Sequence, residues 1–358
     1  MNYAYWLANI PGIGNKTIRQ LLSQVGSAGE LYFLPEKQLR ALAGLGDAEI
    51  SAIQESKRID TEREYMKLCG QGITFLSLEE ETYPVKLRNI PDAPFGIYVK
   101  GRLPGEEQKT VAIVGARMCS EYGHAVAKKL GQQLASNGVC VISGMARGID
   151  SAGHWGTIEV GGMTCAVLGC GVDVCYPASG RKLYDKILDQ GGILSEYSPG
   201  TQPHPGFFPA RNRIISGLSD VVVVVEAKAK SGSLITADFA LEQGKEIYAV
   251  PGRLYDALSV GCNTLIRQGA GIISDVDDFL KELDLCGGKE LYQENFTKLL
   301  LEKEESMVYS GLSLRPTSLE ELLQATGFSM PKLTELLAGL QQRGFITETF
   351  KNYYIRRI

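Results

Sequence analysis

Basic residues and glycines surround one apolar segment in the second half of the chain. Arg211, Asn212 and Arg213 stand just before a predicted helix, which leads to a fully apolar strand at residues 221–225. A polar loop that contains a glycine follows this strand at residues 228–233. Both loops can lie at the rim of one parallel sheet, where the ligands of open α/β sheets bind. Arginine forks, lysines and backbone N–H groups suit phosphate oxygens, so the segment predicts a phosphate-binding surface.

Two other predicted strands end in a glycine turn that carries a basic residue. The first turn contains Gly115 and Arg117, and the second contains Ser143, Gly144 and Arg147. The dinucleotide pattern G-x-G-x-x-G is absent from the first turn, and no acid stands where a ribose would need one. We therefore interpret Arg117 as a phosphate ligand, and the alternative is a surface arginine above a strand–helix turn.

Aromatic residues stand beside the arginines in a proline-rich segment at residues 199–213. They are Phe207 and Phe208, and the prolines around them predict a loop of restricted shape. A base can stack on an exposed ring while a phosphate meets the neighbouring cation, as the binding of a single strand requires. The alternative is that a phenylalanine fills the core, and we expect this of one of the two.

Several further positions could meet phosphate or take part in chemistry. Lys182 lies in a loop after the third strand, where it either binds an anion or is solvated. Lys230, Ser231 and Gly232 could form an anion-binding nest, but the Walker pattern is missing, so ATP hydrolysis is not indicated. His154 could act as a base, yet no partner acid or nucleophile is visible, and a lone helical histidine is more often structural.

The composition is typical of a globular protein with a substantial core. The 358 residues are 44% hydrophobic and 22% charged, which allows two or three domains. The net charge of −4 argues against a protein covered in positive charge, so a nucleic-acid site must be a local patch. The eight cysteines form no C-x-x-C pair and only three histidines are present, so we expect no metal site and no cofactor. Neither a signal peptide nor a long apolar segment is present, which indicates a cytoplasmic protein without membrane contact.

From about residue 109, apolar strands alternate with helices, and most strands end in a glycine. This alternation predicts an α/β fold with a doubly wound, Rossmann-like parallel sheet. We expect the sheet domain at residues 108–285 and expect it to carry the DNA-binding surface. The carboxyl ends of parallel strands meet at one edge, so the turns at Gly115, Gly144 and residues 169–171 are expected there together.

Smaller parts flank the predicted sheet domain. Residues 1–72 predict a helical domain, SAM-like or helix-hairpin-helix-like, which either holds a DNA phosphate or packs without DNA contact. Residues 73–107 predict a connector with short strands. After a polar linker at residues 286–298, three helices and a hairpin at residues 299–358 predict a winged helix. Its third helix carries few cations, so contact with a protein partner is expected of this domain at least as much as the reading of DNA bases.

Six segments of the chain resemble one family in particular. They are VAIVGARMCSEYG, VISGMARGIDSAGHWGT, AVLGCGVDVCYP, SEYSPGTQPHPGFFPARNRIISGLSDVVVVVEA, SGSLITADFALEQGKEIYAVPG and GCNTLIRQGA. Together they resemble the DprA family of DNA-processing proteins, also called Smf, over residues 73–275. The resemblance implies a protein that is not an enzyme, binds single-stranded DNA without sequence preference and loads the recombinase RecA onto it. It also implies a homodimer formed through the Rossmann-like domain, and a role in DNA uptake, natural transformation and homologous recombination.

The same resemblance implies a DNA pocket on particular residues. The family's G-[ST]-R turn falls on Gly115, Ala116 and Arg117, where alanine replaces the hydroxyl residue. The basic pocket of the family falls on Arg117, on the loop at residues 207–213 and on residues 230–231.

Two other functions stay open on the residues alone. A nucleotide-binding or nucleoside-phosphate-cleaving enzyme of the Rossmann type is suggested by the glycine loops and by Glu226 and Asp238 near the sheet rim. A protein-interaction scaffold would instead use the winged helix to hold a partner.

Overall fold

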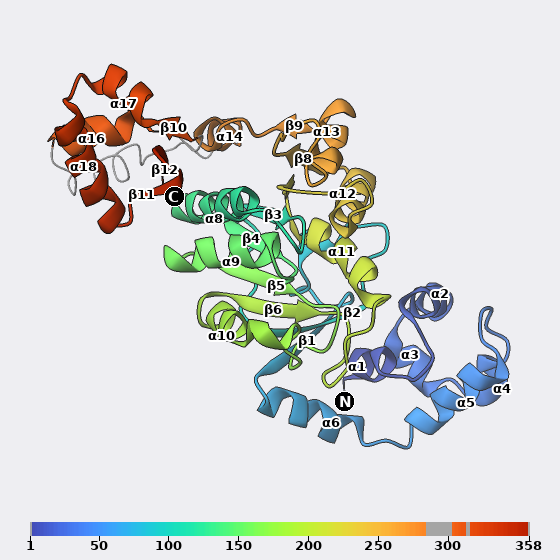
Figure 1. Cartoon of the computed structure of the whole chain (residues 1–358). Helices are drawn as coiled ribbons and strands as arrows, with labels where there is room; N and C mark the ends of the chain where they lie inside the picture. The colour runs from blue at the N-terminus through green and yellow to red at the C-terminus, as the bar shows by residue number, and fades with distance from the viewer. Residues whose placement is uncertain (1, 284–302, 313–315, 357–358) are drawn as a thin grey trace. The chain divides into compact units, whose positions relative to one another are not determined.

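Two units make up the chain in the computed structural model (Figure 1). They comprise residues 1–282 and residues 283–358. The structure describes residues 2–283, 303–312 and 316–356. The predicted linker at residues 286–298 lies outside the described residues, as does the end of the predicted sheet domain at residues 284–285.

A nine-stranded sheet stands at the centre of the described part of the first unit, in the order β1-β2-β6-β5-β4-β3-β7-β8-β9. From β6 to β9 all neighbouring strands are parallel, which confirms the predicted α/β class with a large parallel sheet. The parallel strands are β3 Thr110–Val114, β4 Cys140–Ser143, β5 Thr164–Val167, β6 Gly192–Ser195, β7 Val221–Val224, β8 Glu246–Ala249 and β9 Gly271–Ile272.

The segment predicted as a connector contributes two strands to this sheet. Strands β1 Ile73–Ser77 and β2 Gly96–Gly101 pair with each other in antiparallel fashion, and β2 pairs in the same way with β6. The predicted short strands are therefore an edge of the main sheet and not a separate link between domains.

From β3 onwards, helices and strands of the first unit alternate as the sequence predicts. The helices before β3 are α1 Tyr3–Ala8, α2 Asn15–Val25, α3 Ala28–Phe33, α4 Glu36–Leu39, α5 Asp47–Ser56, α6 Thr61–Gly70 and α7 Val85–Arg88. Those after β3 are α8 Glu121–Ser136, α9 Ile149–Glu159, the 3-10 turn η1 Ala178–Gly180, α10 Arg181–Gln190, α11 Phe207–Leu218, α12 Gly232–Glu242, α13 Val260–Arg267 and α14 Val276–Glu282. None of the described helices is long and apolar enough to cross a membrane.

The central strands are buried on both faces, as helix-covered parallel strands must be. Ala112 and Val114 of β3 belong to one core cluster with Ile214 of α11 and Ala237 of α12. The N-terminal helices share a core with the other end of the sheet, because Trp6 and Leu7 cluster with Ile193 of β6 and its neighbours. Figure 1 shows these helices, in blue, beside the β1 end of the sheet. Residues 1–72 are thus packed onto the sheet within one unit.

Helix α11 begins earlier than the sequence predicts. The proline-rich loop was expected to continue through residue 211, but the helix starts at Phe207 and includes Pro209. A proline in the first turn of a helix removes no intrahelical hydrogen bond, because the first N–H groups have no partner within the helix. Arg211, Asn212 and Arg213 are therefore helical residues, and their side chains are directed by the helix and not by a loop.

The described part of the second unit contains three helices and a small antiparallel sheet. They are α16 Lys303–Ser310, α17 Leu319–Thr326 and α18 Met330–Gln342, with strands β10 Thr317–Ser318, β11 Ile346–Phe350 and β12 Tyr353–Arg356 in the order β10-β12-β11. A capping box is present at the start of α17, where Ser318 and Glu321 exchange side-chain and backbone hydrogen bonds. A leucine-rich core that includes Leu322, Leu333 and Leu340 holds these elements together.

Candidate nucleic-acid interface

The strand order reverses between β3 and β7, and this makes the crevice at their carboxyl ends the expected ligand site. After β3 the chain moves towards β4, β5 and β6, whereas β7, β8 and β9 extend the sheet in the other direction. Ligands of open α/β sheets bind at such a topological switch point. A cavity of about 520 Å³ opens there, and residues from the turns after both strands line it.

Seven of the residues predicted to bind DNA line this cavity. They come from the turn after β3, from helix α11 and from the start of helix α12, and they are Gly115, Arg117, Phe208, Arg211, Asn212, Ser231 and Gly232. The turn after β4 closes against the turn after β3, because Ile149 donates its N–H to the carbonyl of Ala116 at 3.2 Å. Gly148 permits this approach: its φ is 77°, and a Cβ there would lie 2.3 Å from the same carbonyl oxygen.

A cation and two rings are stacked at the rim of the cavity. The guanidinium of the exposed Arg117 lies 5.5 Å from the centre of the Phe208 ring. The other neighbour of Phe208 is Tyr176, whose ring is stacked at 5.4 Å with an angle of 26° between the planes. Tyr176 also lines the cavity and is 42% exposed. The sequence analysis missed Tyr176, although an aromatic residue just before the basic loop at residues 181–182 was a possible signal.

Arg211 forms part of the cavity floor, so the expectation of an exposed arginine fork is wrong at this position, while its contact with phosphate stays a prediction. Its side chain is buried, and its Nη1 donates to the carbonyls of Gly144, at 2.9 Å, and of Val167. A Cβ on Gly144 would lie 2.5 Å from Nη2 of Arg211, which explains the glycine at that position. Burial lowers the pKa of Arg211, and the nearby carboxylate of Asp150 opposes this change. Arg211 therefore contributes positive charge from beneath the cavity.

Asp150 is the acidic group nearest to this charge. Its buried carboxylate accepts the N–H groups of Gly144 at 3.1 Å and of Ala146 at 3.4 Å. Burial raises the pKa of Asp150, while Arg211 and these N–H groups act in the opposite direction. Asp150 lines the cavity, and its carboxylate fixes the turn after β4 at the edge of that cavity.

Arg213 is also buried, and the prediction that it is exposed for phosphate is wrong. Its guanidinium forms a bidentate pair with Glu196, with nitrogen–oxygen distances of 3.1 and 2.6 Å, and its Nε donates to Asp92 at 3.0 Å. The partners follow β6 and precede β2, so the pair fastens α11 to the antiparallel edge of the sheet. Helical geometry points Arg211 and Arg213, two residues apart, to different sides of α11.

The expectation that one phenylalanine fills the core is not met, because both rings are half-buried. Phe207 does not line the cavity, but stacks on Tyr197 at 4.1 Å with an angle of 25° and lies 5.3 Å from the ring of His204. It therefore supports the segment that leads into α11, while Phe208 faces the cavity.

The remaining predicted residues lie outside this cavity. Ser143 is buried, and its hydroxyl donates to the carbonyl of Ile113 at 2.6 Å, so it is not available to DNA. Arg147 is exposed and lies 3.5 Å from the hydroxyl of Ser179. Lys182 is exposed above the ring of Trp155, at 5.9 Å.

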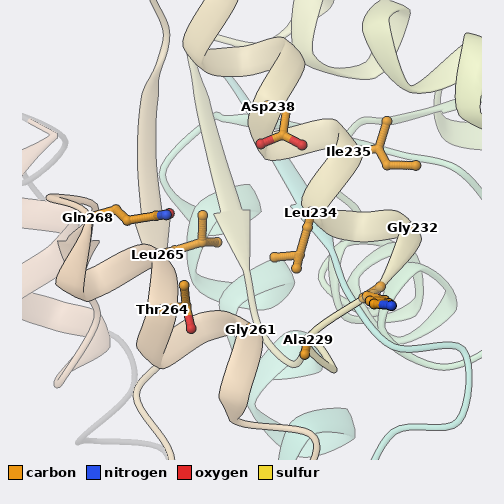
Figure 2. Close-up of a pocket in the computed structure, with 11 residues that line it drawn as sticks. Ala229, Gly232, Leu234, Ile235, Asp238, Gly261, Thr264, Leu265 and Gln268 are labelled. Atoms are coloured by element: carbon orange, nitrogen blue, oxygen red, sulfur yellow. The ribbon is translucent and has the colours of Figure 1, made fainter.

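Lys230 lines a second cavity, of about 470 Å³, beside the first one (Figure 2). Both cavities are lined by residues 231, 232 and 235, so the two cavities adjoin each other. Figure 2 shows that Leu234 of α12 and Leu265 of α13 lie on the two helices that border it.

Two of the three groups considered for an enzyme, His154 and Glu226, are buried in internal contacts. His154 is buried with its Nδ1 2.7 Å from the hydroxyl of Thr164, and burial lowers the pKa of His154 to about 3, so the ring is neutral. Glu226 is buried, and its carboxylate accepts both the N–H and the hydroxyl of Ser120 at the start of α8. Asp238 lies on α12 at the second cavity. Among the described residues, no cluster of three His, Cys, Asp or Glu side chains could hold a metal ion.

In the N-terminal helices, side chains at the start of α2 are bonded to other parts of the protein. The side chain of Asn15, the first residue of α2, bonds to Asp92 at 2.9 Å and accepts the N–H of Phe95 at 2.7 Å. Arg19 donates to the carbonyl of Pro91 at 2.7 Å. The start of α2 thus packs against the segment before β2, and an acidic side chain stands next to it.

Comparison with known proteins identifies the family to which this fold and this cavity belong. The family model of DNA recombination-mediator protein A matches residues 74–284. The chain belongs to this family. The DNA processing protein DprA of Streptococcus pneumoniae is 36% identical over 283 residues, which is 79% of this chain and 98% of that protein. The protein Smf of Synechocystis is 32% identical over 95% of this chain and 88% of its own length.

Solved structures of the DprA family have the same fold. The crystal structure of the S. pneumoniae protein matches with a TM-score of 0.69 at 37% identity, covering 79% of this chain and 98% of that one. The DNA processing protein A of Helicobacter pylori, which binds single-stranded DNA, matches with a TM-score of 0.53 at 32% identity. It covers 59% of this chain and 95% of its own. The family membership predicted from the six segments is thereby confirmed, and with it a role in DNA processing and recombination.

Proposed function

We propose that this chain binds single-stranded DNA without sequence preference, with the strand entering the cavity at the switch point between β3 and β7. The observation that carries the proposal is the stack of Arg117, Phe208 and Tyr176 at the rim of that cavity. An aromatic face accepts any base, and an exposed guanidinium beside it meets the phosphate that follows. The single-stranded DNA bound by the H. pylori relative supports this assignment.

A competition experiment that compares strands of different sequence, and single strands with a duplex, tests this proposal. Anisotropy of labelled oligo-dT, titrated with the protein, should be competed equally by unlabelled oligo-dA and mixed-sequence strands, because stacking and phosphate contacts do not read base edges. A duplex of the same length should compete poorly, since its bases are not available for stacking. Preferential competition by one sequence, or by the duplex, would contradict the proposal.

We further propose that the protein loads RecA onto the bound strand, in DNA uptake, natural transformation and homologous recombination. We also propose that it works in the cytoplasm, as a homodimer formed through the sheet domain. Membership of a recombination-mediator family supports this proposal. In the test, RecA filament formation is followed on strands covered by a single-strand-binding protein, with and without the chain. Faster assembly is expected, and an unchanged rate would contradict loading. Light scattering of the purified protein tests the dimer.

The second unit is proposed to be a winged helix that contacts a protein partner. Three helices followed by a hairpin support this interpretation. The cations of α18 are engaged with acids, since Lys332 lies 2.8 Å from Glu304 and Arg343 pairs with Glu305. Deleting residues 299–358 should therefore leave binding to oligo-dT intact and reduce recombinase loading, which an anisotropy titration and the filament assay measure separately.

A further inference from the structure

The loop between β8 and α13, at residues 250–259, presents an unusual group of exposed side chains. Tyr255 is fully exposed, at 101% of its reference area, and Leu254 is 81% exposed. Arg253 beside them is exposed as well. An aromatic ring in such a position contributes nothing to the core, and exposed apolar groups of this kind are a feature of binding surfaces.

The loop has a defined structure that holds the ring away from the protein. Asp256 donates its N–H to the carbonyl of Arg253 at 3.2 Å, which closes a turn around Leu254 and Tyr255. The carboxylate of Asp256 in turn accepts the N–H of Leu258 at 2.9 Å. At the base of the loop, the side chain of Asn263 accepts the N–H of Gly252 at 3.2 Å and donates to its carbonyl at 3.1 Å.

The same loop is fastened to the segment that leads to the cavity at the switch point. Ala227 donates its N–H to the carbonyl of Leu258 at 2.7 Å and accepts the N–H of Gly261 at 2.8 Å. Ala227 lies three residues after the end of β7, and the exposed Lys228 and Lys230 come after it. Because β8 is the parallel neighbour of β7, the loop lies at the same edge of the sheet as the cavity.

We propose that Tyr255 and Arg253 form a second contact for the bound single strand: a base stacks on the ring of Tyr255 and the following phosphate meets Arg253. This inference rests on the proposed binding of single-stranded DNA. A cavity of about 520 Å³ is the size of a small-molecule site, so a longer strand must continue over the surface. Along this edge it meets alternating cations and an exposed ring, the arrangement that single-strand grooves use.

The test compares full-length variants in their binding to a labelled oligo-dT of about 20 nucleotides, longer than common single-strand site sizes. Tyr255→Ala should weaken binding about tenfold, whereas Tyr255→Phe, which keeps the ring, should bind like wild type. Arg253→Ala should lower the slope of log affinity against log salt by about one. The control is Leu241→Ala, which removes an exposed apolar side chain at the far end of α12 and should change nothing.

The outcomes separate this inference from the function on which it rests. If wild type and all variants fail to bind the strand, the proposed function itself is wrong. If wild type binds and Tyr255→Ala binds equally well, the second contact is contradicted while the cavity remains. A lower molecular mass of Tyr255→Ala in light scattering, with DNA affinity unchanged, would assign the ring to a subunit contact and also overturn the proposal. A melting temperature equal to that of wild type shows that the variants are folded.

Discussion

The Nη1 atom of Arg211 lies 2.9 Å from the carbonyl oxygen of Gly144, so a buried guanidinium joins helix α11 to the end of strand β4. The same atom donates to the carbonyl of Val167 at the end of β5. The three elements that meet below the cavity are therefore held by one cation. In the proposed function, the buried Arg211 acts on a DNA strand through its charge and through the shape of the floor, and the exposed Arg117 is the one that touches the strand.

Replacing Arg211 should lower the stability of the fold, and any loss of DNA binding should follow from that loss of stability. Arg211→Leu should lower the free energy of unfolding by about 3 kcal/mol, because two buried carbonyls lose a charged donor. Urea denaturation measures this loss. The control Arg147→Ala, at an exposed position, should stay within about 0.5 kcal/mol of wild type. A variant as stable as wild type that has lost only DNA affinity would show that Arg211 binds phosphate directly.

The buried His154 should make the stability of the protein depend on pH. Burial lowers the pKa of His154 to about 3, below the value of about 6.5 that it has in the unfolded chain. The unfolded state therefore gains a proton first, so stability present above about pH 6.5 should be lost as the pH falls towards 3. His154→Gln should remove this part of the pH dependence in urea titrations. His124→Gln and His204→Gln, at exposed positions, should not remove it.

Phe208 should contribute to DNA binding through its ring alone. Phe208→Ala should cost about 1–3 kcal/mol in affinity for oligo-dT, because both the base stack and the support of Arg117 are lost. Phe208→Tyr keeps the aromatic face and should bind nearly as well as wild type in the same anisotropy titration. Equal affinity of the alanine variant would show that the strand does not pass this rim.

Glu226 should behave as a structural residue that fixes the start of α8. Its carboxylate accepts two hydrogen bonds from Ser120, three residues after Arg117. Glu226→Leu should therefore lower the free energy of unfolding by about 2 kcal/mol and weaken DNA binding through the turn that carries Arg117. Thermal melting and anisotropy measure the two effects, and Glu242→Gln, at an exposed position of α12, serves as the control. Release of free base from a nucleoside monophosphate, abolished by Glu226→Gln, would instead show catalysis.

The sheet was predictable because its signal is local. The apolar residues of β3 lead into a glycine turn, the valines of β7 lead into a polar loop that contains a glycine, and parallel strands bring such segments to one edge. Gly115, Arg117, Ser231 and Gly232 could therefore be placed at one cavity from the sequence. The capping box at Ser318 is local in the same sense.

The burial of the arginines was not predictable, because their partners lie far away along the chain. Arg211 bonds to Gly144 and Val167, and Arg213 bonds to Glu196 and to Asp92, 121 positions away. In the sequence a basic segment looks the same whether its charges face solvent or an internal carboxylate. The early start of α11 was missed because the prolines were taken as loop residues, although Pro209 fits the first turn of a helix.

Arg117 at the rim of the cavity is proposed to hold the phosphates of a single strand. The most direct measurement is the anisotropy of a labelled oligo-dT titrated with wild type, Arg117→Ala and the control Arg58→Ala, an exposed arginine after α5, over a range of salt concentrations. Arg117→Ala should bind more weakly, with a salt slope reduced by about one, while Arg58→Ala matches wild type. Binding by folded Arg117→Ala with unchanged affinity and salt slope would contradict the account.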